Sequence, residues 1–368
     1  MARNRVIYQS EGVFAGQRTP CTGVNHTGAA DVKEIYRVQS ANYSFNLGKR
    51  DVNQFGELAA IDRILVDPPT VSLDFTYLLA NVYNEQALGM TVGISTNPTS
   101  NAFSGIFAGA TDEKAYWVKT VAYGTDLHGL PSTGYVFGAI GFGNGYISSY
   151  SIDAAVGDFP RASVRVDCSN MKFDNWLSTD EAKQSPCVNK ENGTLIAADT
   201  YRLPSGTSTT SALDQTTVLR PGDVVMTWDN AAAATMGTAI NDAKIQSFTL
   251  SSDISKTPLN KLGSKFAYSQ ETNFPVTASL RITAAVGDMN TGSLTQLLES
   301  TGVNTVGVKI FAPTGSTVNF GFDLKGAQLD SQEYSSSIGD SKTVTMNFSV
   351  PIAGANDLTR GIFLSGRV

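Results

Sequence analysis

Residues 39–76, QSANYSFNLGKRDVNQFGELAAIDRILVDPPTVSLDFT, reveal how this chain is organised because the stretch occurs a second time. A shift of 207 positions without a gap places it on residues 246–283, QSFTLSSDISKTPLNKLGSKFAYSQETNFPVTASLRIT. The two copies are identical at twelve of their 38 positions, whereas unrelated pairs of ordinary composition match at roughly 6–7% of positions. Similarity at a fixed spacing indicates a repeated structural unit. The sequence therefore predicts a duplicated domain.

Each copy begins and ends with alternating apolar and polar residues, the pattern of a half-buried strand. In the first copy we expect these strands at 36–47 and 70–80, and the second copy keeps the same phase. A weaker pair of alternating stretches follows each copy, at 146–167 around Gly157-Asp158 and at 318–350 around Gly339-Asp340. Each half is therefore predicted to hold four amphipathic strands in two long hairpins.

The composition favours an all-β fold with two tandem β-sandwich or barrel domains. Only 16% of the 368 residues are charged, 41% are hydrophobic, and 34 are glycine, which is typical of strands and turns rather than of helices. One short helix is expected in each half, at 81–90 and at 292–301. We predict an extended N-terminal arm at 1–34, a first domain at 35–204 with an irregular insertion at 169–204, and a second domain at 205–368.

Net charge and cysteine content restrict the compartment and the partners. A net charge of −6 argues against a surface that coats nucleic acid. The N-terminal residues lack the apolar core of a signal peptide, and no apolar run is long enough for a membrane span. Cys21, Cys168 and Cys187 lack metal-ligand spacing, so we expect reduced thiols, with a Cys168–Cys187 bridge as an open alternative.

The sequence contains few candidate catalytic residues. The chain has two histidines in unlike contexts, and no nucleophile elbow, P-loop or zinc-protease motif. Asp74 and Asp153 lie on polar strand faces, where a solvated surface is the simplest interpretation, and Cys168 continues an apolar face as a packed thiol. We therefore expect a protein without enzymatic activity, cofactor or metal.

The stretches VQSANYSFNLGKRDVNQFGELAAIDR, PPTVSLDFTY and YISSYSIDAAVGDFPRASVRVD resemble the bacteriophage tail tube (major tail) proteins. The resemblance is good over 39–80 and 145–168 and weaker over 245–285 and 318–350. It implies a β-sandwich flanked by a long loop, and protomers that close into stacked rings around a channel for DNA. Usual family members have one domain per chain and form hexameric rings, and this chain departs from them in being doubled.

The doubling leads to a specific expectation about ring size. If each chain gives eight strands to one barrel, three chains give about 24 strands, and strands spaced ~4.8 Å apart with a tilt of ~45° then give a backbone diameter of ~50 Å. Side chains would leave a channel of ~40 Å. We therefore expect a trimer with pseudo-sixfold symmetry.

The resemblance also suggests which side chains do what. The polar strand faces would line the lumen with a mildly negative surface along which DNA slides. The predicted lumen-facing residues are Asn42, Ser44, Asn46, Ser72, Asp74, Thr76, Ser151, Asp153, Arg165, Asp167, Thr249, Ser251, Asp253, Arg281, Thr283, Asp323, Lys325 and Asn347. The long connection at 49–69 and its counterpart at 256–275 would join stacked rings. The residues predicted for that contact are Asp51, Val52, Asn53, Phe55, Leu259, Asn260 and Leu262.

The expected function is thus that of a structural virion protein of the phage tail, assembled in the host cytoplasm. Its expected partners are further copies of itself, other tail proteins and, transiently, double-stranded DNA, but no membrane. Two alternatives stay open: a tail-tip, hub or tube-initiator protein of the same fold, and a capsid decoration or host-binding β-sandwich protein.

Overall fold

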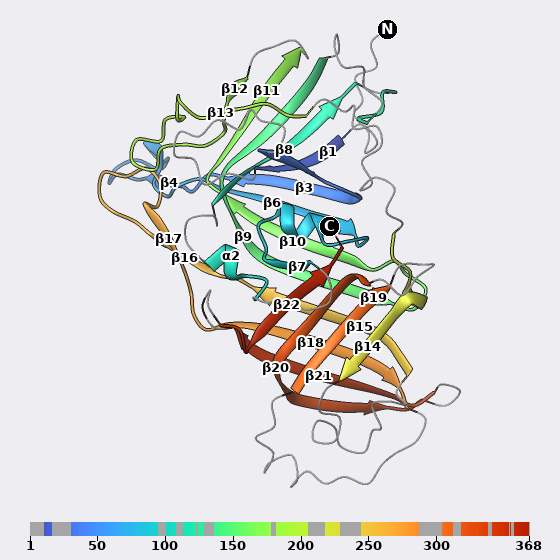
Figure 1. Cartoon of the computed structure of the whole chain (residues 1–368). Coiled ribbons are helices and arrows are strands. Elements are labelled where there is room, and N and C mark those ends of the chain that lie inside the picture. Colours follow the sequence, from blue (N-terminus) through green and yellow to red (C-terminus); the bar gives the residue numbers. More distant parts are fainter. Residues whose placement is uncertain are drawn as a thin grey trace.

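β-Strands make up most of this computed structural model (Figure 1), so the predicted all-β class is confirmed. The structure describes residues 11–16, 31–94, 101–107, 113–122, 124–128, 136–177, 182–204, 218–228, 244–286, 304–311, 318–337, 341–352, 354 and 357–367. Within them lie two short α-helices, α1 (Tyr83–Ala87) and α2 (Ser104–Phe107), and one 3-10 turn at Pro221–Asp223. Helix α1 confirms the helix predicted at 81–90, whereas its predicted counterpart at 292–301 lies outside the described residues.

Eight strands, each antiparallel to its neighbours, form one continuous sheet. In spatial order they are β3 (Val38–Asn46), β6 (Thr70–Leu78), β10 (Arg161–Cys168), β9 (Val136–Ala155), β15 (Lys244–Asp253), β18 (Val276–Ala285), β21 (Thr343–Ile352) and β20 (Val318–Ser335). The first four come from the N-terminal half (residues up to 204) and the last four from the C-terminal half (residues from 218). The two halves meet where β9 pairs with β15, and we call this pairing the internal joint (Figure 1).

A second layer of strands packs on the apolar face of this sheet. The first parts of β9 and β20 belong to this layer, and each strand then crosses into the eight-stranded sheet. The other strands of the layer are β1 (Glu11–Gly16), β2 (Val32–Ile35), β7 (Val92–Ile94), β8 (Lys114–Val121), β11 (Asn170–Leu177), β14 (Val224–Trp228), β19 (Asn304–Phe311) and β22 (Gly361–Gly366). Strand β22 pairs in parallel with β7 and joins the halves a second time.

Three two-stranded hairpins complete the fold. The first hairpin is β4 (Lys49–Val52) with β5 (Asp62–Leu65), and the second hairpin is β16 (Lys256–Leu259) with β17 (Ser269–Thr272). Strands β12 (Lys183–Gln184) and β13 (Thr200–Tyr201) form the third. The first two occupy the long connections of the repeated stretch. Gly56 and Gly263, which match in the repeat, have φ of 91° and 85° in their turns, a conformation that favours glycine.

Strand pairing recurs in the two halves at constant offsets. The pair Asn42–Asp74 reappears as Thr249–Arg281 at an offset of 207. The bulges recur as well: the matched Gln39 and Gln246 are skipped in the register, and each donates its side-chain amide to the carbonyl two residues earlier. In the later hairpins the offset is 182, so that Ser148 and Asp330 are the residues skipped in β9 and β20.

One apolar cluster extends through both halves and lies between the two layers. Alternation on the strands supplies it: Leu73, Ile152, Leu250 and Ile282 are all fully buried. Burial of each such side chain stabilises the fold by about 1.5–3 kcal/mol. The halves therefore share a core. The predicted boundary at 204/205 borders residues outside the described part.

The N-terminal arm and the insertion differ from expectation where they are described. Residues 11–16 form β1, which pairs with β8 and buries Val13 and Phe14, so this part of the predicted arm belongs to the body. Its expected strand at 5–8 lies outside the described residues. The predicted irregular insertion begins with a regular strand, β11, paired along eight residues with β9. Both errors arose because these segments have weak apolar–polar alternation.

The cysteines also depart from the expectation of reduced thiols. Cys187 takes part in a disulfide bond, whereas Cys168 is a free, buried thiol at the end of β10. A Cys168–Cys187 bridge is thereby excluded. Spacing along the chain could not reveal this, because folding decides which cysteines come together.

A buried carboxyl group joins helix α1 to the eight-stranded sheet. Glu85 is fully buried and accepts hydrogen bonds from the hydroxyls of Tyr77 (2.7 Å) and Tyr150 (3.2 Å) through its Oε1. Its Oε2 finds no partner within the described part of the chain. Burial raises the pKa of Glu85 from 4.5 to about 7, although the two tyrosine hydrogen bonds act in the opposite direction.

We expect Glu85→Gln to remove a pH dependence of stability. Because the pKa of Glu85 is raised by folding, its contribution is fully present below pH 4.5 and is lost as the pH rises through about 7. The variant should therefore gain stability relative to the wild type across this window, by at most about 3 kcal/mol at pH 8. Urea unfolding of both proteins at pH 4.5 and pH 8 measures the difference. A constant difference between them across the window would contradict the assignment.

Candidate functional site

The face of the eight-stranded sheet opposite the core is polar and hydrogen-bonded across the strands. Ser44 bonds Ser72 at 3.0 Å, and the matched Ser251 bonds Ser279 at 2.8 Å. Ser349 donates to Asp330 at 2.9 Å on the neighbouring pair of strands in the C-terminal half. Such cross-strand pairs contribute roughly 0.2–1 kcal/mol each. They also keep short side chains in fixed positions along the face.

Carboxylates outnumber basic groups on this polar face. Arg165 lies between Asp167, at 3.3 Å, and Asp74, at 3.9 Å, and all three side chains are about half exposed. Exposed pairs of this kind add little stability, but they leave the surface weakly charged. The acidic residues on the face are Asp74, Asp153, Asp167, Asp253, Asp330 and Glu333, and the basic ones are Arg161, Arg165, Lys244 and Arg281.

The structure brings all but two of the predicted lumen-facing residues together on the polar face. The residues it gathers are Asn42, Ser44, Asn46, Ser72, Asp74, Thr76, Ser151, Asp153, Arg165, Asp167, Thr249, Ser251, Asp253, Arg281, Thr283 and Asn347. Asp323 and Lys325 are corrections. They lie in the first part of β20, which pairs with β19 and β22 in the second layer. Lys325 there places its ammonium 4.2 Å from the centre of the Phe363 ring.

Several residues of the polar face were missed by the sequence analysis. Glu333 lies opposite Thr345, and Asp330 is the bulge residue of β20. The predicted lumen-facing residues of this strand stop at Lys325, although the strand continues to Ser335. Apolar alternation fades in this part of β20, but the offset of 182 from the well-patterned part of β9 could have found it. Arg161 and Lys244 were missed because they lie at strand ends.

The two outer edges of the eight-stranded sheet, β3 and the last part of β20, have no neighbouring strand among the described residues. Along this edge, Tyr43 and Phe45 of β3 and Leu47 just after it are 36%, 59% and 41% exposed. Their counterparts at the internal joint are Leu250 and Ser252 of β15 and Ile254 just after it, which are 0%, 2% and 0% exposed. On β20, Tyr334 is exposed, whereas its counterpart Ile152 is buried. Each edge thus presents apolar groups at positions that the internal joint covers.

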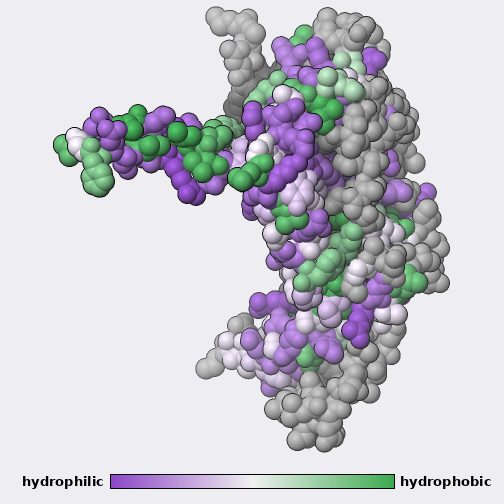
Figure 2. Space-filling model, turned by 90° about the vertical axis from the view of Figure 1, so that its left-hand side faces the viewer, coloured by the Kyte–Doolittle hydropathy of each residue, from purple (hydrophilic) through white to green (hydrophobic). Residues whose placement is uncertain are grey.

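The two hairpins predicted for ring stacking differ in how they are held. The first hairpin is exposed along its whole length, and Figure 2 shows a narrow arm with apolar residues along it at the height of β4 in Figure 1. The second hairpin is half-buried against the N-terminal half. Both tips are free: Phe55 and the matched Leu262 are 105% and 104% exposed. The other residues predicted for this contact are Asp51, Val52, Asn53, Leu259 and Asn260, which lie in the same hairpins.

Neither metal-binding side chains nor known relatives assign a function to these surfaces. Within the described residues there is no group of three or more histidine, cysteine or acidic side chains that could hold a metal ion. No helix in the described part is both long and apolar enough to cross a membrane. Comparison with protein-family models gave no match, and comparison with curated proteins gave no significant match. The candidate functional surfaces are therefore the polar face, the two sheet edges and the two hairpins.

Proposed function

We propose that this chain is a structural protein of a phage tail that polymerises into stacked rings and forms the tail tube. The observation that carries the proposal is the internal joint. In this joint β9 pairs with β15 of the same chain and apolar groups are buried. The counterparts of these groups are exposed at the outer edges of the sheet, on β20 and β3. A second copy of the chain would cover those edges by the same pairing, because exposed apolar strand edges favour association with another strand.

The offsets predict a specific register for this pairing between chains. Leu250 lies opposite Ile152 in the internal joint, so Tyr43 of one copy would lie opposite Tyr334 of the next. Ser252 lies opposite Tyr150, so Phe45 would lie opposite Gln332. In the internal pair the larger side chain is Tyr150 of β9, whereas in the corresponding pair between chains it is Phe45 of β3. Because glutamine is larger than serine, the pair between chains would be bulkier than Ser252–Tyr150, and the interface between copies has to accommodate that extra volume.

The eight-stranded sheet supports a trimeric ring. Three copies joined edge to edge would supply about 24 strands and a channel of ~40 Å. The polar face would then line the channel, since the opposite face is covered by the second layer. Its weak acidity would let phosphates pass without the strong binding that follows from counterion release.

Negative-stain electron microscopy of the purified chain tests the proposal. Hollow tubes with threefold end views support it. Single closed rings that do not stack would favour a tail-tip or tube-initiator protein. Compact particles without a channel would overturn it in favour of a decoration or host-binding protein. Sixfold rings would keep the tube but overturn the arrangement of eight strands per chain.

Charge reversal on the polar face should make the tubes retain DNA. We expect tubes of Asp74→Lys/Asp253→Lys to bind double-stranded DNA at low salt and release it at high salt, whereas wild-type tubes do not bind. Asp74→Lys also removes one of the two carboxylates near Arg165. Cosedimentation of a short duplex with tubes at two salt concentrations measures this. Asp126→Lys, at an exposed position off the sheet, is the control. Equal binding by both variants would contradict the lumen assignment.

A further inference from the structure

The second hairpin is held on the N-terminal half by specific contacts. The backbone N–H groups of Lys265 and Phe266 donate to the carbonyls of Glu191 and Lys190 at 3.1 Å each. Lys261 pairs with Glu191 at 2.5 Å, and the hydrogen bond from Lys261 and its positive charge lower the pKa of Glu191. Residues 189–191 belong to the insertion after β11, so this insertion serves as a support for the second hairpin.

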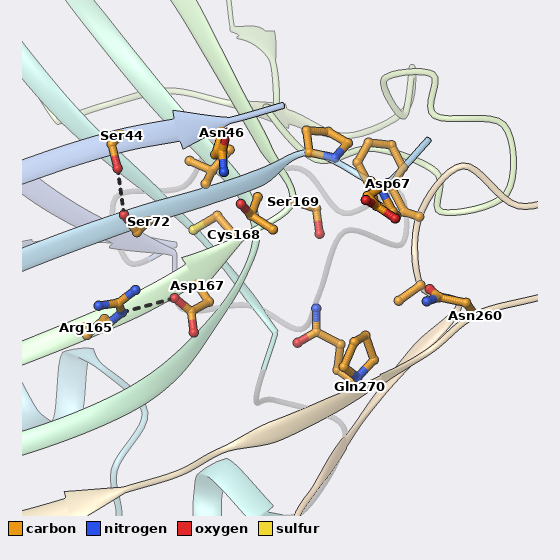
Figure 3. A pocket seen from close by; sticks show the side chains of 17 residues that line it. Ser44, Asn46, Asp67, Ser72, Arg165, Asp167, Cys168, Ser169, Asn260 and Gln270 are labelled. Atoms are coloured by element: carbon orange, nitrogen blue, oxygen red, sulfur yellow. Dashed lines mark hydrogen bonds and ion pairs between the residues drawn. The ribbon is translucent and has the colours of Figure 1, made fainter. Parts of the chain in front are cut away.

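The middle part of the second hairpin encloses a cleft of about 630 Å³ with the N-terminal half, and we call it the inner cleft. Figure 3 shows Asn260 and Gln270 of the hairpin on one side, facing Asp67 and Ser169 on the other. The wall of the N-terminal half is formed by the ends of β3, β6 and β10 together with Pro68 and Pro69. The inner cleft thus lies where the N-terminal half contacts the second hairpin, which belongs to the C-terminal half.

A similar cleft of about 650 Å³ lies at the corresponding place on the C-terminal half, and we call it the outer cleft. Phe274 and Pro275 line it and are the counterparts of Asp67 and Pro68 at the offset of 207. Pro351 lines it and is the counterpart of Ser169 at the offset of 182. Asp357, Thr359 and Arg360 complete the wall. None of the residues lining the outer cleft comes from a hairpin strand.

Among the residues that the structure describes, the outer cleft lacks the wall that the second hairpin provides in the inner cleft. The first hairpin has the residues that match this wall. Asn53, Ala60 and Arg63 are the counterparts of Asn260, Ala267 and Gln270, which line the inner cleft. Strands β4 and β5 are exposed throughout, and Ile64 and Leu65 are among their large exposed apolar residues. An exposed arm with apolar side chains of this kind is typical of a surface that binds a partner.

We propose that the first hairpin of one copy occupies the outer cleft of the next copy in the ring, as the second hairpin occupies the inner cleft within the chain. This inference rests on the proposed ring and names the partner surface of its first hairpin. The hairpin would bring Asp51 and Arg63 to a wall that carries Asp357 and Arg360, so both signs of charge can be matched. The hairpin is held in this way along its middle part and not at its tip. The tip stays free for an axial contact, as Leu262 does in the second hairpin.

Paired cysteines and a bis-maleimide crosslinker test the contact. In Asn53→Cys/Phe274→Cys we expect dimers and trimers on a denaturing gel, at least tenfold more abundant than in either single variant. Asn260→Cys/Asp67→Cys is the matched internal pair and should crosslink within one chain, without a change in mass. Asn53→Cys/Phe173→Cys, with an exposed second position that does not line the outer cleft, controls for random collision.

The outcomes separate this inference from the proposed function. If electron microscopy shows rings and the Asn53–Phe274 pair does not link chains, the contact is overturned while the ring stands. If that pair links within a single chain, the first hairpin reaches the outer cleft of its own chain, and the contact between copies is again overturned. If the chain remains monomeric in every assay, both the contact and the ring are overturned.

Discussion

Phe45→Lys should leave the chain folded but prevent it from forming rings. Phe45 is largely exposed on the free edge of β3, so its replacement hardly affects the chain itself. In the proposed ring it is covered at the position of Ser252, which the internal joint buries. The variant loses about 1.5–3 kcal/mol of apolar burial at each joint between chains and must also bury a charge. Because a ring closes through three such joints, we expect assembly to fall by more than about a hundredfold.

Sedimentation velocity at matched concentrations measures this effect. Val225→Lys is the control, because Val225 is similarly exposed but lies on β14 in the second layer. We expect the control to assemble like the wild type. Rings of Phe45→Lys with normal stability would show that β3 is not a joint. A cysteine pair at Tyr43 and Tyr334 provides a positive test of the same register, since these residues would lie directly opposite each other.

Phe55→Ser/Leu262→Ser should give rings that do not stack into tubes. Both tips are fully exposed in the isolated chain, so the substitutions cost the fold almost nothing. In the proposed tube the tips bury apolar area against the next ring, and each chain would lose about 3–6 kcal/mol of that contact. Three chains act together at each ring interface, so we expect the mean tube length to fall to one or a few rings.

Tube lengths from electron micrographs measure this effect, with Val136→Ser as a control at another exposed apolar position. The control should form tubes of normal length. Long tubes of the double variant would show that stacking uses another surface, whereas loss of the rings themselves would place the tips in the lateral contact.

Much of the fold was predictable because the repeated stretch encodes local geometry. The alternation around Leu73 and Leu250 placed the strands and their buried faces, since a one-residue shift would expose the whole apolar set. Several matched residues have local reasons for being alike. Gln39 and Gln246 are bulge residues, Ser44 and Ser251 make the same cross-strand bond, and Gly56 and Gly263 adopt positive φ.

The sequence failed where a residue's environment depends on distant strands. Asp323 and Lys325 alternate like lumen residues, but β20 changes layers before it reaches the polar face. Residues 11–16 look like an arm because their alternation is weak, and one of their two partner strands, β8, lies about 100 residues away. The disulfide at Cys187 could not be predicted either, because the pairing of cysteines depends on which segments meet in the folded chain.

The sequence by itself thus determined the all-β class, the positions and polar faces of the repeated strands, and the repeat itself. These depend on side-chain periodicity and on short-range turn and bulge geometry, both of which can be read along the chain. Only the tertiary structure decided that the eight strands form one sheet, that Leu250 and Ile254 are buried while Tyr43 and Leu47 are exposed, and that one hairpin is held while the other is free. Those features depend on which edges meet in space, and periodicity along a strand carries no information about its neighbour.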